Sequence, residues 1–202
     1  MICQSWDTAN KPTELSDYSV CTTWGIKEKH LFLLHVFRKR LGYPELKRAV
    51  QEQAEAFAPR VILIEDKASG TQLIQELASE GVHAIKKYEP TLDKIMRMHS
   101  VTSMIENGFA HLPDRAAWLG EYLHELTGFP RGKHDDQADS TSQALDWFKQ
   151  QSMTHVYGLI DYMKREAERI KTREVPSFDS PLVNRGALLR EWDRRRLPFQ
   201  RS

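Results

Sequence analysis

The sequence predicts an α/β protein in which a central mixed sheet is covered by helices. Three strand-like segments lie within the first 40 residues, a run of mostly β-branched residues follows at 61–65, and helix-like and strand-like segments then alternate. We therefore expect a five-stranded sheet, with three antiparallel strands followed by parallel strands, flanked by helices. The 202 residues are 40% hydrophobic, which is enough for one domain with its own core.

Short polar connections separate the first three strands, which favours an antiparallel meander. These strands are expected at ICQSWDTA (2–9), DYSVCTTWGI (17–26) and HLFLLHVFRK (30–39). A helix should begin at Tyr43 or Pro44 and end near Phe57, because a proline in the first turn lacks only an N–H that has no partner there. The run VILIE (61–65) is typical of a strand buried on both faces.

The remainder of the domain is expected to be mainly helical. The expected elements are helices over 71–80, 93–107, 114–126 and 135–150, a fifth strand over 82–88, and a short extended piece at 109–113. In the last helix Ala138, Thr141, Leu145 and Phe148 form one apolar stripe. This stripe should face the sheet.

Charge and composition divide the chain into three parts. Residues 1–150 form the expected folded domain and carry a net charge of −3, whereas residues 151–202 hold 11 of the 29 basic residues against 7 acidic ones. We expect 151–171 to form a C-terminal helix and 172–202 to be a basic, flexible tail, since this stretch has few core-sized apolar residues and is interrupted by prolines. A basic tail on a slightly acidic body is compatible with a polyanionic partner or with an ordinary solvated surface.

Several classes of protein are excluded. The chain contains no run of 18 apolar residues and no apolar leader, so we expect neither a membrane protein nor a secreted precursor. Cys3 and Cys21 have no zinc-ligand spacing and read as buried thiols in a reducing compartment. Phosphate-loop, dinucleotide-binding, HExxH and GxSxG motifs are all absent.

Carboxylates stand at strand ends and at one helix start, where a rigid scaffold can aim them at a common point. They are Asp7 in the first strand, Glu65 and Asp66 at the end of VILIE, and Asp135, Asp136 and Asp139 in the last helix. If the first and fourth strands are neighbours, Asp7 and Glu65 lie side by side, and a helix crossing that edge adds its own acids. Converging carboxylates repel one another unless a cation joins them in an oxygen cage. The alternative for the helix acids is capping, and for Asp7 an edge position.

Seven segments, taken together and in order, resemble one known family. They are SWDTA (5–9), SDYSV (16–20), VILIEDKASG (61–70), DKIMR (93–97), ENGFAHLP (106–113), HELTGFPRGKHDDQADS (124–140) and SQAL (142–145). This set resembles the C-terminal nuclease domain of the large terminase subunit of tailed bacteriophages, over about residues 1–150. The resemblance implies an RNase H-like fold, related to RuvC-type resolvases.

The resemblance also implies roles for individual residues. Asp7, Glu65, Asp136 and Asp139 correspond to the catalytic acids that hold two Mg²⁺ or Mn²⁺ ions, with Asp135 and Asp66 as adjacent acids that could replace Asp136 and Glu65. Oxygen-only ligands suit these ions better than zinc. Basic residues near the site are expected to contact the phosphate backbone without reading bases; they are Lys67, Lys94, Arg97, Arg131 and Lys133.

The activity implied is metal-dependent endonucleolytic hydrolysis of double-stranded DNA in the cytoplasm of a bacterial host. The family's ATPase, with its phosphate loop, is missing from this sequence, so we expect either an excised domain or a prophage remnant. Implied partners are a terminase ATPase domain, the small terminase subunit and the portal protein, with no membrane. Two alternatives stay open: a catalytically inactive docking module of the packaging complex, and a RuvC-like junction resolvase.

Overall fold

The computed structural model describes residues 1–8, 18–66, 69–151 and 168. The chain divides into two compact units, Met1–Thr154 and His155–Ser202, and every described residue except Glu168 belongs to the first. The helix expected over 151–171 and the tail expected over 172–202 therefore lie almost wholly outside the described residues, as does Lys67. None of the described helices is long and apolar enough to cross a membrane.

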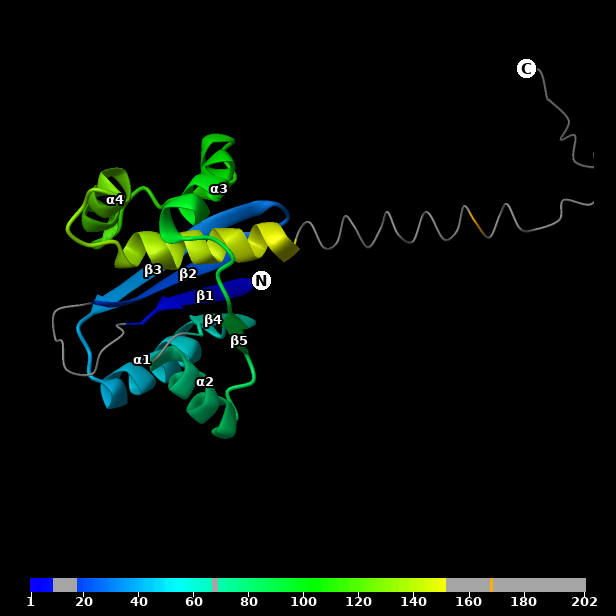
Figure 1. Cartoon of the computed structure of the whole chain (residues 1–202), viewed down its shortest axis with the longest axis vertical. Helices are drawn as coiled ribbons and strands as arrows, with labels where there is room; N and C mark the ends of the chain where they lie inside the picture. Colours follow the sequence, from blue (N-terminus) through cyan, green and yellow to red (C-terminus); the bar gives the residue numbers. More distant parts are fainter. Residues whose placement is uncertain (9–17, 67–68, 152–167, 169–202) are drawn as a thin grey trace, which may run out of the picture. The chain divides into compact units, whose positions relative to one another are not determined.

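The described residues form one mixed sheet of six strands in the order β5-β4-β1-β2-β3-β6, and Figure 1 labels β1 to β5. Their bounds are β1 Ile2–Asp7, β2 Ser19–Lys27, β3 His30–Lys39, β4 Val61–Glu65, β5 Ile85–Tyr88 and β6 Ala110–His111. As predicted, β1, β2 and β3 pair antiparallel and β4 and β5 add in parallel. The sixth strand, β6, lies within the extended piece expected at 109–113, and its pairing with Leu31 and Phe32 of β3 adds it to the five predicted strands. It is too short to show a strand pattern in the sequence.

Five helices accompany the sheet. Their bounds are α1 Tyr43–Phe57, α2 Ser69–Ser79, α3 Lys94–Glu106, α4 Leu119–Gly128 and a last helix over 136–151. Helix α4 begins later than predicted, because the residues before Leu119 form turns, and Leu119 N–H donates to the carbonyl of Ala116. The fifth strand is likewise shorter than expected, because turn residues precede Ile85.

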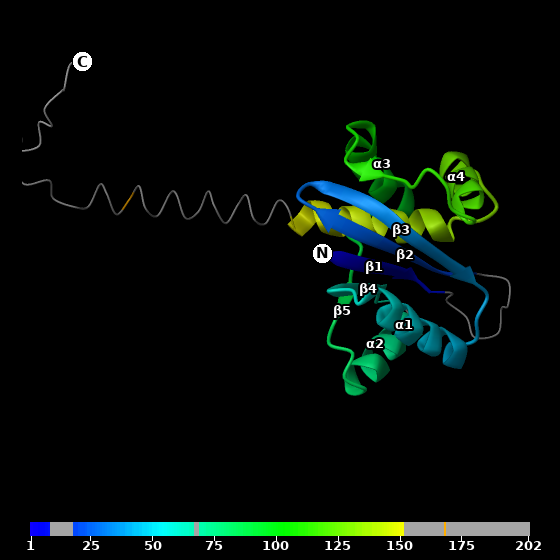
Figure 2. The same ribbon diagram turned by 180° about the vertical axis from the view of Figure 1, so that it is seen from behind.

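Helices cover both faces of the sheet, and strand alternation decides which side chains meet which helices. Helices α1 and α2 lie on one face, and α3, α4 and the 136–151 helix lie on the other (Figures 1 and 2). Trp6, Ile62 and Ile64 pack with the α1–α2 layer in one core. Two further cores, the larger centred on Trp24 and Leu145, fill the space under the opposite layer. The sheet is therefore buried on both sides, as its apolar fourth strand predicted.

Both cysteines are buried, free thiols within this packing, as predicted. Burial raises the pKa of the Cys3 thiol to about 12, so it stays protonated at neutral pH. It packs with Leu63 and Trp147 in one of the cores. The role of Cys3 is therefore structural.

Candidate functional site

The register of the sheet brings Asp7 and Glu65 to the same edge. Trp6 of β1 pairs with Ile64 of β4 in parallel, so Asp7 and Glu65 follow as the next residues at the carboxyl ends of neighbouring strands. Because Trp6 and Ile64 face the α1–α2 layer, alternation turns Asp7 and Glu65 to the opposite face, which the 136–151 helix covers. The two strand acids of the sequence prediction therefore lie side by side, on the side of the helix acids.

Ser140 fastens the 136–151 helix to the sheet close to Asp7. Its hydroxyl donates to the carbonyl of Ser5 at 2.7 Å, and the Ser5 hydroxyl donates back to the carbonyl of Ser140 at 2.7 Å. The backbone N–H of Thr22 donates to the Ser140 hydroxyl at 3.1 Å. Ser140 is itself fully buried between small neighbours, so the helix backbone approaches the strands closely. This contact carries the first turn of the helix, with Asp136 and Asp139, to the edge that holds Asp7.

The acids at this edge act on one another electrostatically. The pKa of Asp7 is raised well above its ordinary value, first by burial of the carboxyl group and then by the charges of Asp139, Asp136 and Glu65, while Lys94 works in the opposite direction. Four carboxylates, from β1, β4 and the last helix, therefore lie close enough for their charges to interact at Asp7. Such a set gains stability from added positive charge.

Lys94 and Arg97 of α3 supply positive charge to Asp139. Arg97 Nη2 donates to Asp139 Oδ1 at 2.9 Å, and its Nε donates to the Ser142 hydroxyl at 3.0 Å. Lys94 bonds the second oxygen of Asp139 and reaches Asp135 Oδ2 at 3.1 Å. Burial raises the pKa of Asp139, and these two cations oppose that shift. Asp139 is thus held by a guanidinium and an ammonium.

Arg97 does not fit its predicted role as a contact to DNA. The residue is only 2% exposed and both donors named above are used inside the protein. The sequence pattern DKIMR could not show this, because the buried carboxylate that Arg97 contacts on the inner side of α3 belongs to Asp139, far along the chain. Arg97 therefore supports Asp139 inside the protein and is too buried to contact DNA.

The structure separates the pairs of adjacent acids that the sequence left open. Asp66 turns to Lys87, at 2.5 Å, and to the Thr71 hydroxyl, at 2.7 Å, and these contacts lower its pKa. Glu65 is among the neighbouring charges that raise the pKa of Asp7. Asp135 is nearly half exposed and bonds Lys94. Glu65 and Asp136 therefore belong to the group around Asp7, and Asp66 and Asp135 lie beside it.

Glycine is required where α2 starts behind Glu65. A Cβ atom on Gly70 would come within 2.0 Å of the Glu65 carbonyl oxygen, closer than any real contact. Only a residue without a side chain lets this helix begin so near the end of β4. Gly70 thereby fixes the backbone that presents Glu65.

Glu125 of α4 is a site residue that the sequence prediction missed. Its carboxylate accepts from the backbone N–H of Gln137 at 2.6 Å, from the Gln137 side chain at 2.7 Å and from the N–H of Ala138 at 3.3 Å. It is 7% exposed and lies 3.7 Å from Arg38. Glu125 therefore caps the helix that carries Asp136 from another element. A glutamate 12 residues away gives no capping pattern in the sequence.

The donor set fits a hard divalent cation. All of the candidate ligands are carboxylate oxygens, which Mg²⁺ and Mn²⁺ prefer, and positive charge would relieve the repulsion that raises the pKa of Asp7. Among the described residues no three His, Cys, Asp or Glu side chains already stand close enough together to hold an ion. Binding would thus require the carboxylates to turn toward the ion, with Lys94 moving aside from Asp139.

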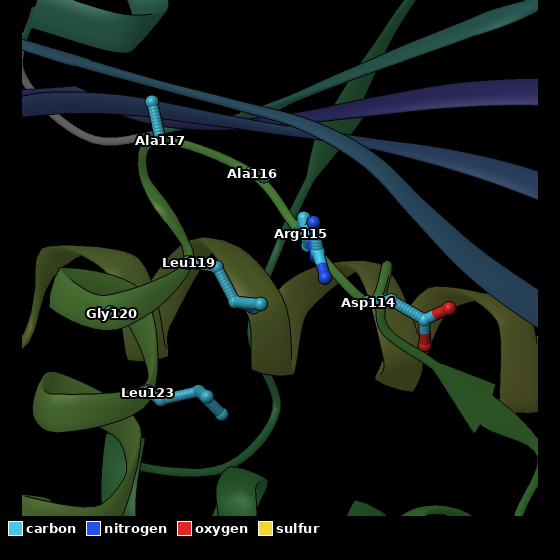
Figure 3. A pocket seen from close by; sticks show the side chains of 7 residues that line it. All are labelled: Asp114, Arg115, Ala116, Ala117, Leu119, Gly120 and Leu123. Atoms are coloured by element: carbon cyan, nitrogen blue, oxygen red, sulfur yellow. The ribbon is translucent and has the colours of Figure 1, made fainter.

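One surface hollow in the described part of the protein lies elsewhere and contains none of these acids. It has a volume of about 540 Å³ and is formed by one continuous stretch that enters α4 (Figure 3). Its lining consists of Asp114, Arg115, Ala116, Ala117, Leu119, Gly120 and Leu123. Because this lining offers one carboxylate and mostly small or apolar groups, the hollow is not the chemical site.

Comparison with solved structures defines the class of fold. The large terminase nuclease of the thermophilic phage G20c with bound cobalt superposes with a TM-score of 0.57 at 16% identity, covering 72% of this chain and 80% of that one. The yeast mitochondrial Holliday junction resolvase gives a TM-score of 0.56 at 14% identity, covering 77% and 82%. The large terminase of another thermophilic bacteriophage, in complex with ADP, gives 0.56 at 13% identity, covering 72% of this chain and 39% of that one. The protein thus has the RNase H-like fold.

Sequence comparison identifies the family within this class. The model of the family described as terminase RNaseH-like domain matches residues 4–147, a span that includes all four acids. The chain belongs to this family. Among curated proteins, none matches the chain. The chain spans about two fifths of the length of the ADP-bound large terminase named above.

Proposed function

We propose that this protein is a divalent-metal-dependent endonuclease that hydrolyses double-stranded DNA, as the nuclease part of a phage or prophage packaging terminase. The proposal rests on one observation. At the carboxyl ends of β1 and β4, burial and the charges of Glu65, Asp136 and Asp139 raise the pKa of Asp7. The similarity to terminase nucleases and to resolvases, one of them solved with Holliday junction DNA, supports it. The proposed setting is the host cytoplasm, with a terminase ATPase domain, small terminase subunit and portal protein as partners.

In this mechanism the role of the carboxylates is to hold the positively charged metal ions in place. Asp7, Glu65 and Asp136 would hold two Mg²⁺ or Mn²⁺ ions, and Asp139 would be a further ligand if Lys94 turned away from it. The ions, when bound, supply electrostatic stabilisation of the phosphodiester and a more acidic water. Lys94 is half exposed, so its ammonium group can turn from Asp139 to a phosphate oxygen. Arg97 stays in place and keeps Asp139 oriented.

The phosphate backbone would approach over the loop before the last helix. Arg131 and Lys133 are exposed there, within four residues of Asp135, and remain the proposed DNA contacts together with Lys94 and Lys67. Contacts of this kind depend on charge and carry no base sequence. We therefore expect cleavage without marked sequence preference.

Plasmid cleavage tests the proposal. Supercoiled plasmid should be nicked and linearised with Mn²⁺ or Mg²⁺ and left intact in EDTA. No cleavage with either ion, by protein that binds the ion, would support the inactive docking module. The structural neighbour from yeast mitochondria makes junction resolution the second candidate. Preference for a four-way junction over linear duplex in the same buffer would favour that candidate.

A further inference from the structure

A compact arrangement of aromatic and cationic side chains lies at the same end of the sheet as the acids. The guanidinium carbon of Arg38 is 3.6 Å from the centre of the Tyr18 ring, and that of Arg40 is 4.4 Å from it. His134 packs edge-on against the same ring, with centres 5.3 Å apart. We call Tyr18, Arg38, Arg40 and His134 the Tyr18 cluster. None of these residues is a proposed ligand of the metal ions.

Strand register fixes the place of the Tyr18 cluster relative to the site. Asp7 pairs with Val20 of β2, and Val20 pairs with Arg38 of β3, so these residues form one row across the sheet. Two strand spacings separate the ends of this row, which is about 10 Å. His134 joins the Tyr18 cluster to the start of the 136–151 helix from the other side. The cluster thus borders the proposed site.

The arginines of the Tyr18 cluster differ in whether a carboxylate balances their charge. Arg38 is nearly buried and bonds Glu121 and approaches Glu125, so its charge is compensated inside the protein. Two exposed cations lie near it, and neither forms an ion pair with any residue of the described part of the chain. They are Arg40, which stands over the Tyr18 ring, and Lys133, which lines a hollow together with Arg38 and His134. Among the described residues, therefore, the positive charge of the surface around Tyr18 is not balanced by an ion pair at Arg40 or Lys133.

We infer that the Tyr18 cluster, with Lys133, is a seat for the phosphate backbone of duplex DNA beside the cleavage site. The inference rests on the proposed nuclease function and adds the place where the duplex lies. Cation–π contact with Tyr18 holds the Arg40 guanidinium ready, which lowers the entropy lost when it binds a phosphate. A strand presents one phosphate per about 3.4 Å of helix axis, so the seat would meet phosphates about three nucleotides from the one at Asp7.

Binding of a short fluorescent duplex, followed by anisotropy in EDTA at several salt concentrations, tests this inference. Arg40→Gln and Lys133→Gln should each weaken binding about three- to tenfold at low salt and reduce the salt slope by about one contact. Arg60→Gln is the matched control, because Arg60 is also exposed but stands just before β4, at the end of the strand opposite Glu65. It should leave the affinity and the salt slope unchanged.

Substitutions of Tyr18 test whether its ring holds Arg40 for DNA binding. Tyr18→Phe keeps a ring under Arg40 and should bind DNA like the parent, whereas Tyr18→Leu should lose about two- to fivefold in affinity. Unchanged affinity in both Arg40→Gln and Lys133→Gln, or an equal loss in Arg60→Gln, would overturn the inference. The assay contains no metal and reads no cleavage. A parent protein that binds DNA through these residues yet never cuts it would reject the nuclease proposal alone.

Discussion

Asp139 is buried and touches two cations from one helix, an arrangement that costs stability whenever a partner is removed. Its oxygens face Arg97 and Lys94, and both Arg97 and Asp139 are almost inaccessible to water. A buried carboxylate without its cation is expensive to keep ionised. The acid that the sequence offered as a metal ligand therefore also organises the packing of α3 on the last helix.

Replacing Arg97 tests this pairing. Arg97→Met should lower the free energy of unfolding by about 3–5 kcal/mol, because it leaves Asp139 buried with only Lys94 beside it. Adding Asp139→Leu should restore part of the loss, since the uncompensated charge is then gone. Urea unfolding of the two single variants and the double variant measures the coupling. Additive losses would show that the two side chains do not act as a pair.

Single residues show what the sequence could and could not predict about the site. The proximity of Asp7, Glu65 and Asp136 was predictable, because acids at strand ends and at a helix start are unusual enough to be seen in one sequence; their role as metal ligands stays a prediction. The internal roles of Arg97 and Glu125 were not, because they depend on how helices far apart in the chain pack together. Position along the chain does not reveal which face of α3 turns inward.

At the scale of elements, the 136–151 helix is placed by contacts that come from other parts of the chain. Ser140 bonds β1 and β2 under its first turns, and Glu125 of α4 caps its N-terminus. These two supports fix where the helix acids lie relative to Asp7. The placement of the site therefore depends on α4 as much as on the strands.

The Glu125 cap can be tested with a matched variant on the same helix. Glu125→Gln should lower stability by about 1–2 kcal/mol and weaken Mn²⁺ binding in calorimetry, because the helix start loses a charged acceptor. Glu121→Gln is the control: Glu121 bonds Arg38 but not the last helix, and its side chain is 63% exposed. Equal metal affinity in the two variants would refute a positioning role for Glu125.

The junction between β4 and α2 makes a second prediction at this scale. Gly70→Ala should destabilise the protein by about 1–3 kcal/mol and weaken metal binding, because its Cβ would push α2 away from the Glu65 backbone. Gly120→Ala meets nothing within 4 Å and should leave stability unchanged or raise it by up to about 1 kcal/mol. Thermal melts of both variants decide the matter. A Gly70→Ala protein that melts at the temperature of the parent would show that the backbone between β4 and α2 can shift to make room for the added Cβ.

Most elements were predictable because their patterns are local. The long apolar strands and the helix with its proline start appear within about 2 residues of their expected places. Strand β6 and the late start of α4 were not predictable, since two residues pair with β3 only through tertiary packing and turns replace the expected first helical residues. The crossing of the last helix over β1 likewise depends on a contact between residues 135 apart in sequence.

At the scale of the molecule, the acids at one edge of the sheet should couple metal binding to stability. Repulsion among the carboxylates opposes folding in the absence of an ion, so an ion that binds only the folded state stabilises it. At about one hundred times its dissociation constant, Mn²⁺ should add about 2–3 kcal/mol and raise the melting temperature by about 4–10 °C. EDTA should reverse the shift. An equal shift in Asp7→Asn would place the binding elsewhere.

Cleavage of supercoiled plasmid in Mn²⁺ by matched acid variants tests the central claim most directly. Asp7→Asn, Glu65→Gln and Asp136→Asn each remove one charge at nearly constant shape and should abolish cleavage while circular dichroism stays that of the parent. Asp135→Asn, beside the group and bonded to Lys94, should retain much of it. Cleavage by the parent that persists in EDTA, or that survives in any two of the first three variants, would contradict the assignment of this carboxylate site.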